Sequence, residues 1–128
     1  MILIVDDEPE LGASLAKMLR FSGLEAEAVT SGGEALALLS VHTPRLIILD
    51  LQMPLLGGLV LLKSIRSDPV FKAVPILVYT SDFSLSSQNG ALDAGAQDYI
   101  VKGTIGWDAL LTRVRELLAD RPPLRITQ

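Results

Sequence analysis

Carboxylates stand at the ends of two short apolar runs of this chain. Residues 1–5 (Met-Ile-Leu-Ile-Val) lead into Asp6 and Asp7, and residues 46–49 (Leu-Ile-Ile-Leu) lead into Asp50. Such runs are typical of strands buried on both faces of a parallel sheet, and ligands bind these sheets just outside the carboxyl ends of the strands. Two like charges about 4 Å apart repel by on the order of 4 kcal/mol at an effective dielectric constant of 20. The sequence therefore predicts an acidic site that needs a cation.

Two further strands bring a hydroxyl and an amine to the same predicted edge. The run at residues 76–79 ends at Thr80, and the run at residues 99–101 ends at Lys102. Only the strand predicted at residues 26–29 ends on residues without evident chemistry. One edge of the sheet should thus collect three carboxylates, one hydroxyl and one amine.

This set of groups suits phosphoryl chemistry. Oxygen ligands without sulfur or imidazole favour Mg²⁺, which is typically held by one or two carboxylates together with water and phosphate oxygens. A carboxylate can attack phosphorus and form an aspartyl phosphate, and a metal ion and an amine neutralise charge on the phosphoryl oxygens. A hydroxyl can donate to a phosphoryl oxygen. Every role in the phosphorylation of an aspartate has a candidate.

Strand and helix signals alternate along the chain, which is typical of a parallel sheet with right-handed crossovers and helices on both faces. The predicted helices run from Pro9 to Gly23, then with Leu36 and Leu39 inward up to Pro44, through Leu59, Leu62 and Ile65 to Asp68-Pro69, over residues 84–93, and through Leu110, Leu111, Val114, Leu117 and Leu118 to Pro122-Pro123. We expect an α/β fold, a single-domain doubly wound sheet of five parallel strands.

Composition excludes several classes of protein. Of 128 residues 49% are hydrophobic, yet no apolar stretch approaches the ~18 residues needed to span a bilayer. The absence of cysteine excludes disulfides and thiolate metal sites, and a net charge of −4 argues against binding of nucleic acid. No basic leader precedes a hydrophobic segment, so we expect no signal peptide and a cytoplasmic protein.

Four segments carry a family resemblance: Val5-Asp6-Asp7-Glu8; Leu49-Asp50-Leu51-Gln52-Met53-Pro54 with Gly58; Tyr79-Thr80-Ser81; and Gly95-Ala96-Gln97-Asp98-Tyr99-Ile100-Val101-Lys102. Each segment alone is common, but together, in this order and at this spacing, they are specific. The chain resembles the receiver domain of bacterial two-component response regulators over nearly all of its length.

The resemblance implies the roles of the acids. Asp50 would be the phosphoacceptor, receiving a phosphoryl group from a histidine kinase or a histidine phosphotransfer protein. Asp7 and Asp6, together with Asp50 and the backbone carbonyl of Gln52, would hold Mg²⁺. The single histidine, His42, is not placed to donate a phosphoryl group, so the donor should be another protein.

The resemblance also implies a switch. Lys102 would pair with the phosphoryl group, Thr80 would move toward it, and Tyr99 would turn inward as Thr80 shifts. The implied fold is flavodoxin-like with strand order 2-1-3-4-5. The fourth helix, fifth strand and fifth helix would form the output face, which could also support a homodimer.

One residue departs from the family pattern. The family usually has proline after the lysine, often with a cis peptide bond, whereas Gly103 follows Lys102 here. A cis bond without proline costs roughly 2.5–4 kcal/mol. Glycine permits either isomer, which leaves the reach of the Lys102 amine open at this point.

The expected organisation is a receiver domain over residues 1–121, followed at residues 122–128 by a tail or the start of a linker. We expect a phosphorylation switch rather than an enzyme, with only Mg²⁺-dependent self-phosphorylation and autodephosphorylation. Its output would pass to a downstream protein or to a fused output domain.

Several alternatives stay open. The chain could be a receiver-fold interaction module that signals without phosphorylation, although the complete set of acids, Thr80 and Lys102 argues against it. A hydrolase with an aspartyl intermediate is disfavoured, because the sequence offers no further general acid and no cap segment. Tyr99 could simply pack with its hydroxyl in water. Residues 84–95, rich in weak helix formers, could be a marginal helix held by packing or a segment that changes order on phosphorylation.

Overall fold

The computed structural model describes residues 1–119 as one five-stranded parallel sheet of order β2-β1-β3-β4-β5. In chain order the elements are β1 (Ile2–Val5), α1 (Pro9–Phe21), β2 (Ala26–Val29), α2 (Gly32–Leu39), β3 (Leu46–Leu49), α3 (Gly58–Ser67), a 3-10 turn (Pro69–Phe71), β4 (Ile76–Thr80), α4 (Leu85–Asp93), β5 (Asp98–Val101) and α5 (Trp107–Ala119). The predicted fold class and strand order are confirmed.

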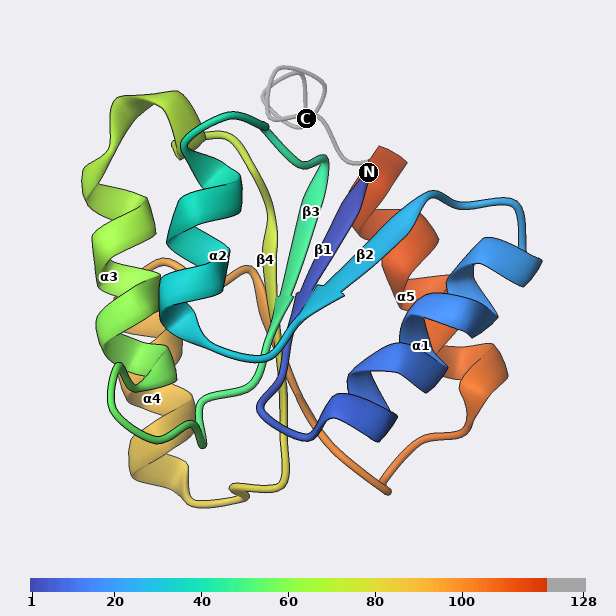
Figure 1. Cartoon of the computed structure of the whole chain (residues 1–128). Helices are drawn as coiled ribbons and strands as arrows, with labels where there is room; N and C mark the ends of the chain where they lie inside the picture. The colour runs from blue at the N-terminus through green and yellow to red at the C-terminus, as the bar shows by residue number, and fades with distance from the viewer. Residues whose placement is uncertain (120–128) are drawn as a thin grey trace, which may run out of the picture.

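The helices form a layer on each face of the sheet (Figure 1). Helices α2, α3 and α4 cover one face, and α1 and α5 cover the other. Strands β1 and β3 are buried along their whole length, as expected for central strands covered on both faces. Alternate strand residues face opposite layers, so Leu3 and Val5 pack toward α2 and α3, while Ile2 and Ile4 pack toward α1 and α5.

Helix boundaries follow local signals in the sequence. Pro9 occupies the first turn of α1, where its missing N–H costs no hydrogen bond. Ser31 caps α2 by accepting a hydrogen bond from the N–H of Glu34 at 3.1 Å. Asp68 ends α3 and caps the short turn that follows, since its side chain accepts from the N–H of Val70 at 3.0 Å. That turn was not anticipated from the sequence.

One predicted core position is wrong. Leu36 was expected to face inward with Leu39, but Leu36 is 39% exposed whereas Leu39 is 6% exposed. The buried stripe of α2 consists of Gly32, Ala35 and Leu39. In a helix so rich in apolar residues, periodicity alone does not locate the edge of the stripe.

Helix α4 forms where a weak helix was predicted, but few of its side chains are buried against the rest of the protein. Ala91 is its only buried residue, whereas Leu85 is 70% and Leu92 46% exposed. Stability of a short helix comes mostly from packing of an apolar face. The start of α4 therefore depends on polar contacts at its N-terminus.

No helix within residues 1–119 is long and apolar enough to cross a membrane. The predicted domain boundary near residue 121 and the helix break at Pro122-Pro123 lie outside the described residues.

Candidate functional site

The sheet brings the predicted site residues to one edge. Main-chain hydrogen bonds between neighbouring strands fix where these residues lie along the strand direction. The N–H of Asp50 donates to the carbonyl of Val5 at 2.9 Å, and the N–H of Lys102 donates to the carbonyl of Thr80 at 2.8 Å. Strands β1 and β3 pair in register at their ends, with Val5 opposite Leu49. The residue after each strand consequently lies at the same edge, as parallel topology requires.

The Lys102 ammonium lies between two buried acids. Its Nζ is 2.8 Å from Asp6 Oδ2 and 2.9 Å from Asp50 Oδ2. The three side chains are 10%, 6% and 4% exposed, in the order Lys102, Asp6, Asp50. Glu8 Oε1 lies farther away, at 3.7 Å, on a side chain that is 65% exposed, where an ion pair contributes little.

The electrostatics of Lys102 reflect two opposing effects. Burial by itself lowers the pKa of the Lys102 amine, because desolvation disfavours the charged form. Hydrogen bonds to Asp6 and Asp50 and the charges of these carboxylates outweigh burial, so the pKa of Lys102 is raised above its ordinary value. The amine is therefore a fixed positive charge at neutral pH.

The second oxygen of each buried acid is held by the backbone. Asp6 Oδ1 accepts from the N–H of Glu8 at 2.9 Å, and Asp50 Oδ1 accepts from the N–H of Gln52 at 2.9 Å. Each carboxylate therefore has one oxygen on a loop amide and the other on Lys102. Among the described residues, no buried side-chain nitrogen or oxygen lacks a hydrogen-bond partner, so the cluster is polar but fully satisfied.

Three carboxylates could hold a metal ion. One ligand oxygen each from Asp6, Asp7 and Asp50 lies within 4.8 Å of the others, with Asp7 half-buried. A set made only of carboxylate oxygens suits Mg²⁺, which takes hard oxygen ligands and retains several waters. The Gln52 N–H donates to Asp50, and the role of the Gln52 carbonyl as a metal ligand stays a prediction.

Thr80 is fully buried at the end of β4, with 0% exposure. Its Oγ1 accepts from the N–H of Asp82 at 3.3 Å. The Thr80 hydroxyl thus contacts the loop that leads into α4.

Tyr99 contacts the same loop. Its hydroxyl donates to the carbonyl of Asp82 at 2.6 Å, so the alternative that this hydroxyl is left in water is wrong. Burial raises the pKa of Tyr99, and the charges of Asp82 and Asp50 raise it further. The Tyr99 side chain thus points to the β4–α4 loop, and the rotation that the resemblance implies for it stays a prediction.

The peptide bond between Lys102 and Gly103 is trans, since residues 1–119 contain no cis peptide bond. Gly103 has φ of +85°, a conformation that glycine adopts without steric cost. With this isomer the amine reaches both Asp6 and Asp50, which answers the question left open by the missing proline.

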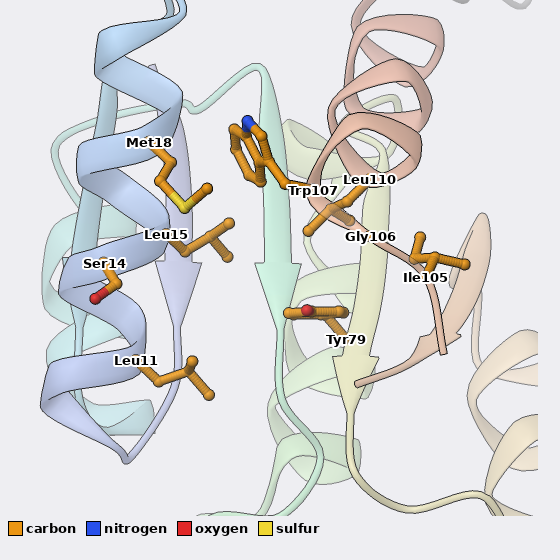
Figure 2. A pocket seen from close by; sticks show the side chains of 9 residues that line it. All are labelled: Leu11, Ser14, Leu15, Met18, Tyr79, Ile105, Gly106, Trp107 and Leu110. Atoms are coloured by element: carbon orange, nitrogen blue, oxygen red, sulfur yellow. The ribbon is translucent and has the colours of Figure 1, made fainter. Parts of the chain in front are cut away.

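Sequence reasoning missed an apolar groove beside the acids. A hollow of about 170 Å³ lies between α1 and α5. Its lining is shown in Figure 2 and comprises Leu11, Ser14, Leu15, Met18, Tyr79, Ile105, Gly106, Trp107 and Leu110. Leu11 and Ser14 also line a neighbouring acidic depression with Asp7 and Glu8, so the groove adjoins the carboxylate cluster.

Two signals in the sequence pointed to this groove without identifying it. Leu11, Leu15 and Met18 recur at helical spacing, but Leu11 and Met18 are 38% and 39% exposed. Trp107, the single tryptophan of the chain, projects between the two helices (Figure 2). Tyr79 forms the floor, and the Lys102 ammonium lies 5.9 Å from the centre of its ring, within cation–π range.

Comparisons with known proteins agree with this geometry. The response regulator receiver domain family matches residues 2–115. Response regulator MprA of Mycobacterium sp. (strain KMS) is 39% identical over 122 residues, which are 95% of this chain and 52% of that protein. The chain thus spans about half the length of the curated relatives it matches.

Solved structures are similar over most of the chain. A CheY-like response regulator receiver domain protein of Methanospirillum hungatei JF-1 has a TM-score of 0.84 and 31% identity, covering 91% of each chain. The BeF3-activated N-terminal receiver domain of Klebsiella pneumoniae RstA has a TM-score of 0.83 and 30% identity, covering 93% of this chain and 98% of that one.

Proposed function

The chain belongs to the response regulator receiver domain family, and from this membership we propose that it accepts a phosphoryl group on Asp50 and thereby switches a protein-binding surface. The observation that carries the proposal is the buried pairing of Lys102 with both Asp6 and Asp50. This pairing places the proposed nucleophile, the Asp50 carboxylate after β3, next to a positive countercharge, the Lys102 ammonium after β5.

The proposed reaction is transfer to a carboxylate. An Asp50 oxygen forms a bond to phosphorus while the bond from phosphorus to an imidazole nitrogen of the donor breaks, and the electron pair of that bond stays with the imidazole. The backbone contact from Gln52 orients the Asp50 carboxylate, so little reorientation is required before attack.

Asp6, Asp7, Asp50 and the carbonyl of Gln52 are the residues proposed to hold Mg²⁺. The acidic oxygen cluster fits that ion. When bound, the ion would neutralise negative charge on the transferring phosphoryl group.

Lys102 and Thr80 are proposed to recognise the phosphoryl group. The Lys102 ammonium, next to Asp50, would pair with a phosphoryl oxygen in place of the Asp50 carboxylate charge. The Thr80 hydroxyl would donate to another oxygen, which requires it to move from its present contact with the loop.

The proposed phosphoryl donor is a histidine kinase or a histidine phosphotransfer protein. His42 precedes the amino end of β3, at the edge of the sheet opposite Asp50, so transfer within the chain is not favoured. The apolar groove between α1 and α5, which meets the acidic depression at Leu11 and Ser14, would receive apolar side chains of the donor.

The proposed output face consists of α4, β5 and α5. Helix α4 of this face exposes Leu85 and Leu92, apolar side chains suited to a protein contact. A downstream protein, a fused output domain of a longer chain, or a second copy in a homodimer could use this face. The proposed location is the cytoplasm, where such donors would act.

The proposal does not include turnover of an outside substrate; self-phosphorylation and autodephosphorylation would be the only chemistry. The competing function is an interaction module that keeps the receiver fold and signals without phosphate. The complete set of acids with Lys102 in place favours the switch.

Incubation with acetyl phosphate separates the two functions. We expect stoichiometric, Mg²⁺-dependent phosphorylation of the wild-type chain and none of Asp50→Asn. A folded wild-type chain that takes up no phosphoryl group, with no change in Trp107 fluorescence on adding Mg²⁺ and acetyl phosphate, would support the phosphorylation-independent module.

A further inference from the structure

Asp82 connects both switch residues to the start of α4. Its N–H donates to Thr80 Oγ1 at 3.3 Å, and its carbonyl accepts from the Tyr99 hydroxyl at 2.6 Å. Its carboxylate turns the other way, toward α4: Oδ1 accepts from the N–H of Ser84 at 2.9 Å, and Oδ2 accepts from the Ser87 hydroxyl. Asp82 thus contacts the side chains of Thr80 and Tyr99 on one side, and the N-cap residue Ser84 and the helix residue Ser87 on the other.

Ser87 makes two contacts at the beginning of the helix. Its N–H donates to Ser84 Oγ at 3.2 Å, which caps α4, and its hydroxyl donates to the Asp82 carboxylate. The Ser87 hydroxyl and the Ser84 N–H lower the pKa of Asp82, in that order of effect. The carboxylate is thus charged at neutral pH and accepts strong, charge-assisted hydrogen bonds.

These polar contacts matter because α4 has few others. Only Ala91 of this helix is buried, and Leu85 next to the cap is 70% exposed. A segment with few buried apolar contacts lies at the low-stability end of a protein. The position of the Asp82 peptide, and of the carbonyl that Tyr99 uses, is therefore set largely by the contacts of the Asp82 side chain with Ser84 and Ser87.

We propose that Asp82 and Ser87 form a latch that holds the Asp82 carbonyl where Tyr99 can donate to it. The latch biases the switch toward the arrangement with Tyr99 against the β4–α4 loop. Its consequence for signalling rests on the proposed function: a Thr80 hydroxyl that turns to a phosphoryl group would release the Asp82 N–H, while the latch keeps Tyr99 engaged.

The same geometry gives the Asp82 carboxylate a structural role in the loop. In this arrangement both carboxylate oxygens are occupied by Ser84 and Ser87. Asp82 therefore acts here as a positioning residue of the loop.

Fluorine NMR of Tyr99 tests the latch directly. The chain has two tyrosines, Tyr79 and Tyr99, so 3-fluorotyrosine in a Tyr79→Phe background reports on Tyr99 alone. In Ser87→Ala we expect the resonance to move toward that of free 3-fluorotyrosine and the pKa of Tyr99 to fall toward its ordinary value. Ser87→Thr, which keeps the hydroxyl, should restore the original resonance.

Matched variants separate the latch from general damage to the helix. Ser86→Ala alters an exposed serine one position earlier and should leave the resonance unmoved. Asp82→Ala removes the contacts with both Ser84 and Ser87, so it should move the resonance at least as far as Ser87→Ala does. The double variant should move it no further than Asp82→Ala, because Ser87 acts through Asp82. Circular dichroism would verify that each variant is folded.

A Ser87→Ala resonance at the wild-type position would overturn the latch, as would equal shifts in Ser86→Ala and Ser87→Ala. All spectra are recorded without a phosphodonor. A shifted resonance in Ser87→Ala together with no phosphorylation of Asp50 would support the latch and refute the proposed function. An unshifted resonance together with phosphorylation of Asp50 would refute the latch and support the proposed function.

Discussion

Lys102 Nζ lies 2.9 Å from Asp50 Oδ2 although 52 residues separate the two in the chain. The contact follows from topology: Lys102 follows β5, Asp50 follows β3, and only β4 stands between these strands in the sheet. The same ammonium also contacts Asp6, at 2.8 Å. A single cation thus offsets part of the repulsion between two buried carboxylates.

Replacing Lys102 should destabilise the chain and impair phosphorylation. Lys102→Ala leaves two buried carboxylates without their shared partner, which costs about 3 kcal/mol in unfolding free energy. Because Mg²⁺ can supply the missing charge, adding Mg²⁺ should raise the melting temperature of Lys102→Ala more than that of the wild type. Lys63→Ala, at an exposed lysine, is the control. Equal Mg²⁺ effects on both variants would contradict this electrostatic account.

Gly58 should be essential for the geometry of Asp50. A Cβ at Gly58 would lie 2.4 Å from the Asp50 carbonyl oxygen and 2.4 Å from Leu51 Cα, which are backbone atoms that cannot rotate away. Gly58→Ala should therefore cost roughly 1–3 kcal/mol and slow phosphorylation by acetyl phosphate. Gly57→Ala is a matched control, since a Cβ there meets nothing within 4 Å. Equal behaviour of the two variants in urea unfolding and labelling would refute the expectation.

The groove between α1 and α5 should affect transfer from a protein donor only. Leu11→Ser should reduce the rate of transfer from a histidine kinase selected for its activity on the wild type, while labelling by acetyl phosphate stays unchanged. Leu36→Ser is the control, because Leu36 is similarly exposed, 39% against 38% for Leu11, but lies on the other face of the sheet. A Leu11→Ser variant with normal kinase transfer would exclude the groove as a docking surface.

Asp82 should contribute to stability in a pH-dependent way. Its pKa is lowered in the folded state, by the Ser87 hydroxyl first and then by the Ser84 N–H. A lowered folded pKa adds stability above the ordinary value of 3.8, and this is lost as pH falls through the folded pKa. Asp82→Asn should thus melt at a lower temperature than the wild type at pH 7, with the gap narrowing on acidification. A gap of constant size would show that the carboxylate charge is not involved.

The site was largely predictable because parallel topology converts chain order into position. Once Asp6, Asp50, Thr80 and Lys102 are recognised as strand-end residues, the sheet must collect them, whatever the details of packing. The five strands were also located to within a residue, most clearly β1 and β3, which are uniformly apolar and buried.

What the sequence did not predict depends on side-chain direction and on loops. The contacts of Asp82 with Ser84 and Ser87 arise from a four-residue loop whose conformation leaves no periodic signal. The groove escaped notice because Leu11 and Met18 match core periodicity yet lie at its edge, and Leu36 was misplaced for the same reason. Buried positions and positions at the edge of the buried stripe lie less than one turn apart on a helix, and hydrophobic periodicity does not distinguish them.

Borohydride reduction of the phosphorylated chain tests the central claim most directly. An aspartyl phosphate is an acyl phosphate, which borohydride reduces to an alcohol, so a phosphorylated aspartate becomes homoserine and can be located by peptide mass spectrometry. After treatment with acetyl phosphate and Mg²⁺ we predict homoserine at position 50 and at no other aspartate. Homoserine at Asp6 or Asp7, or its absence from a folded chain, would contradict the assignment of Asp50 as the phosphoacceptor.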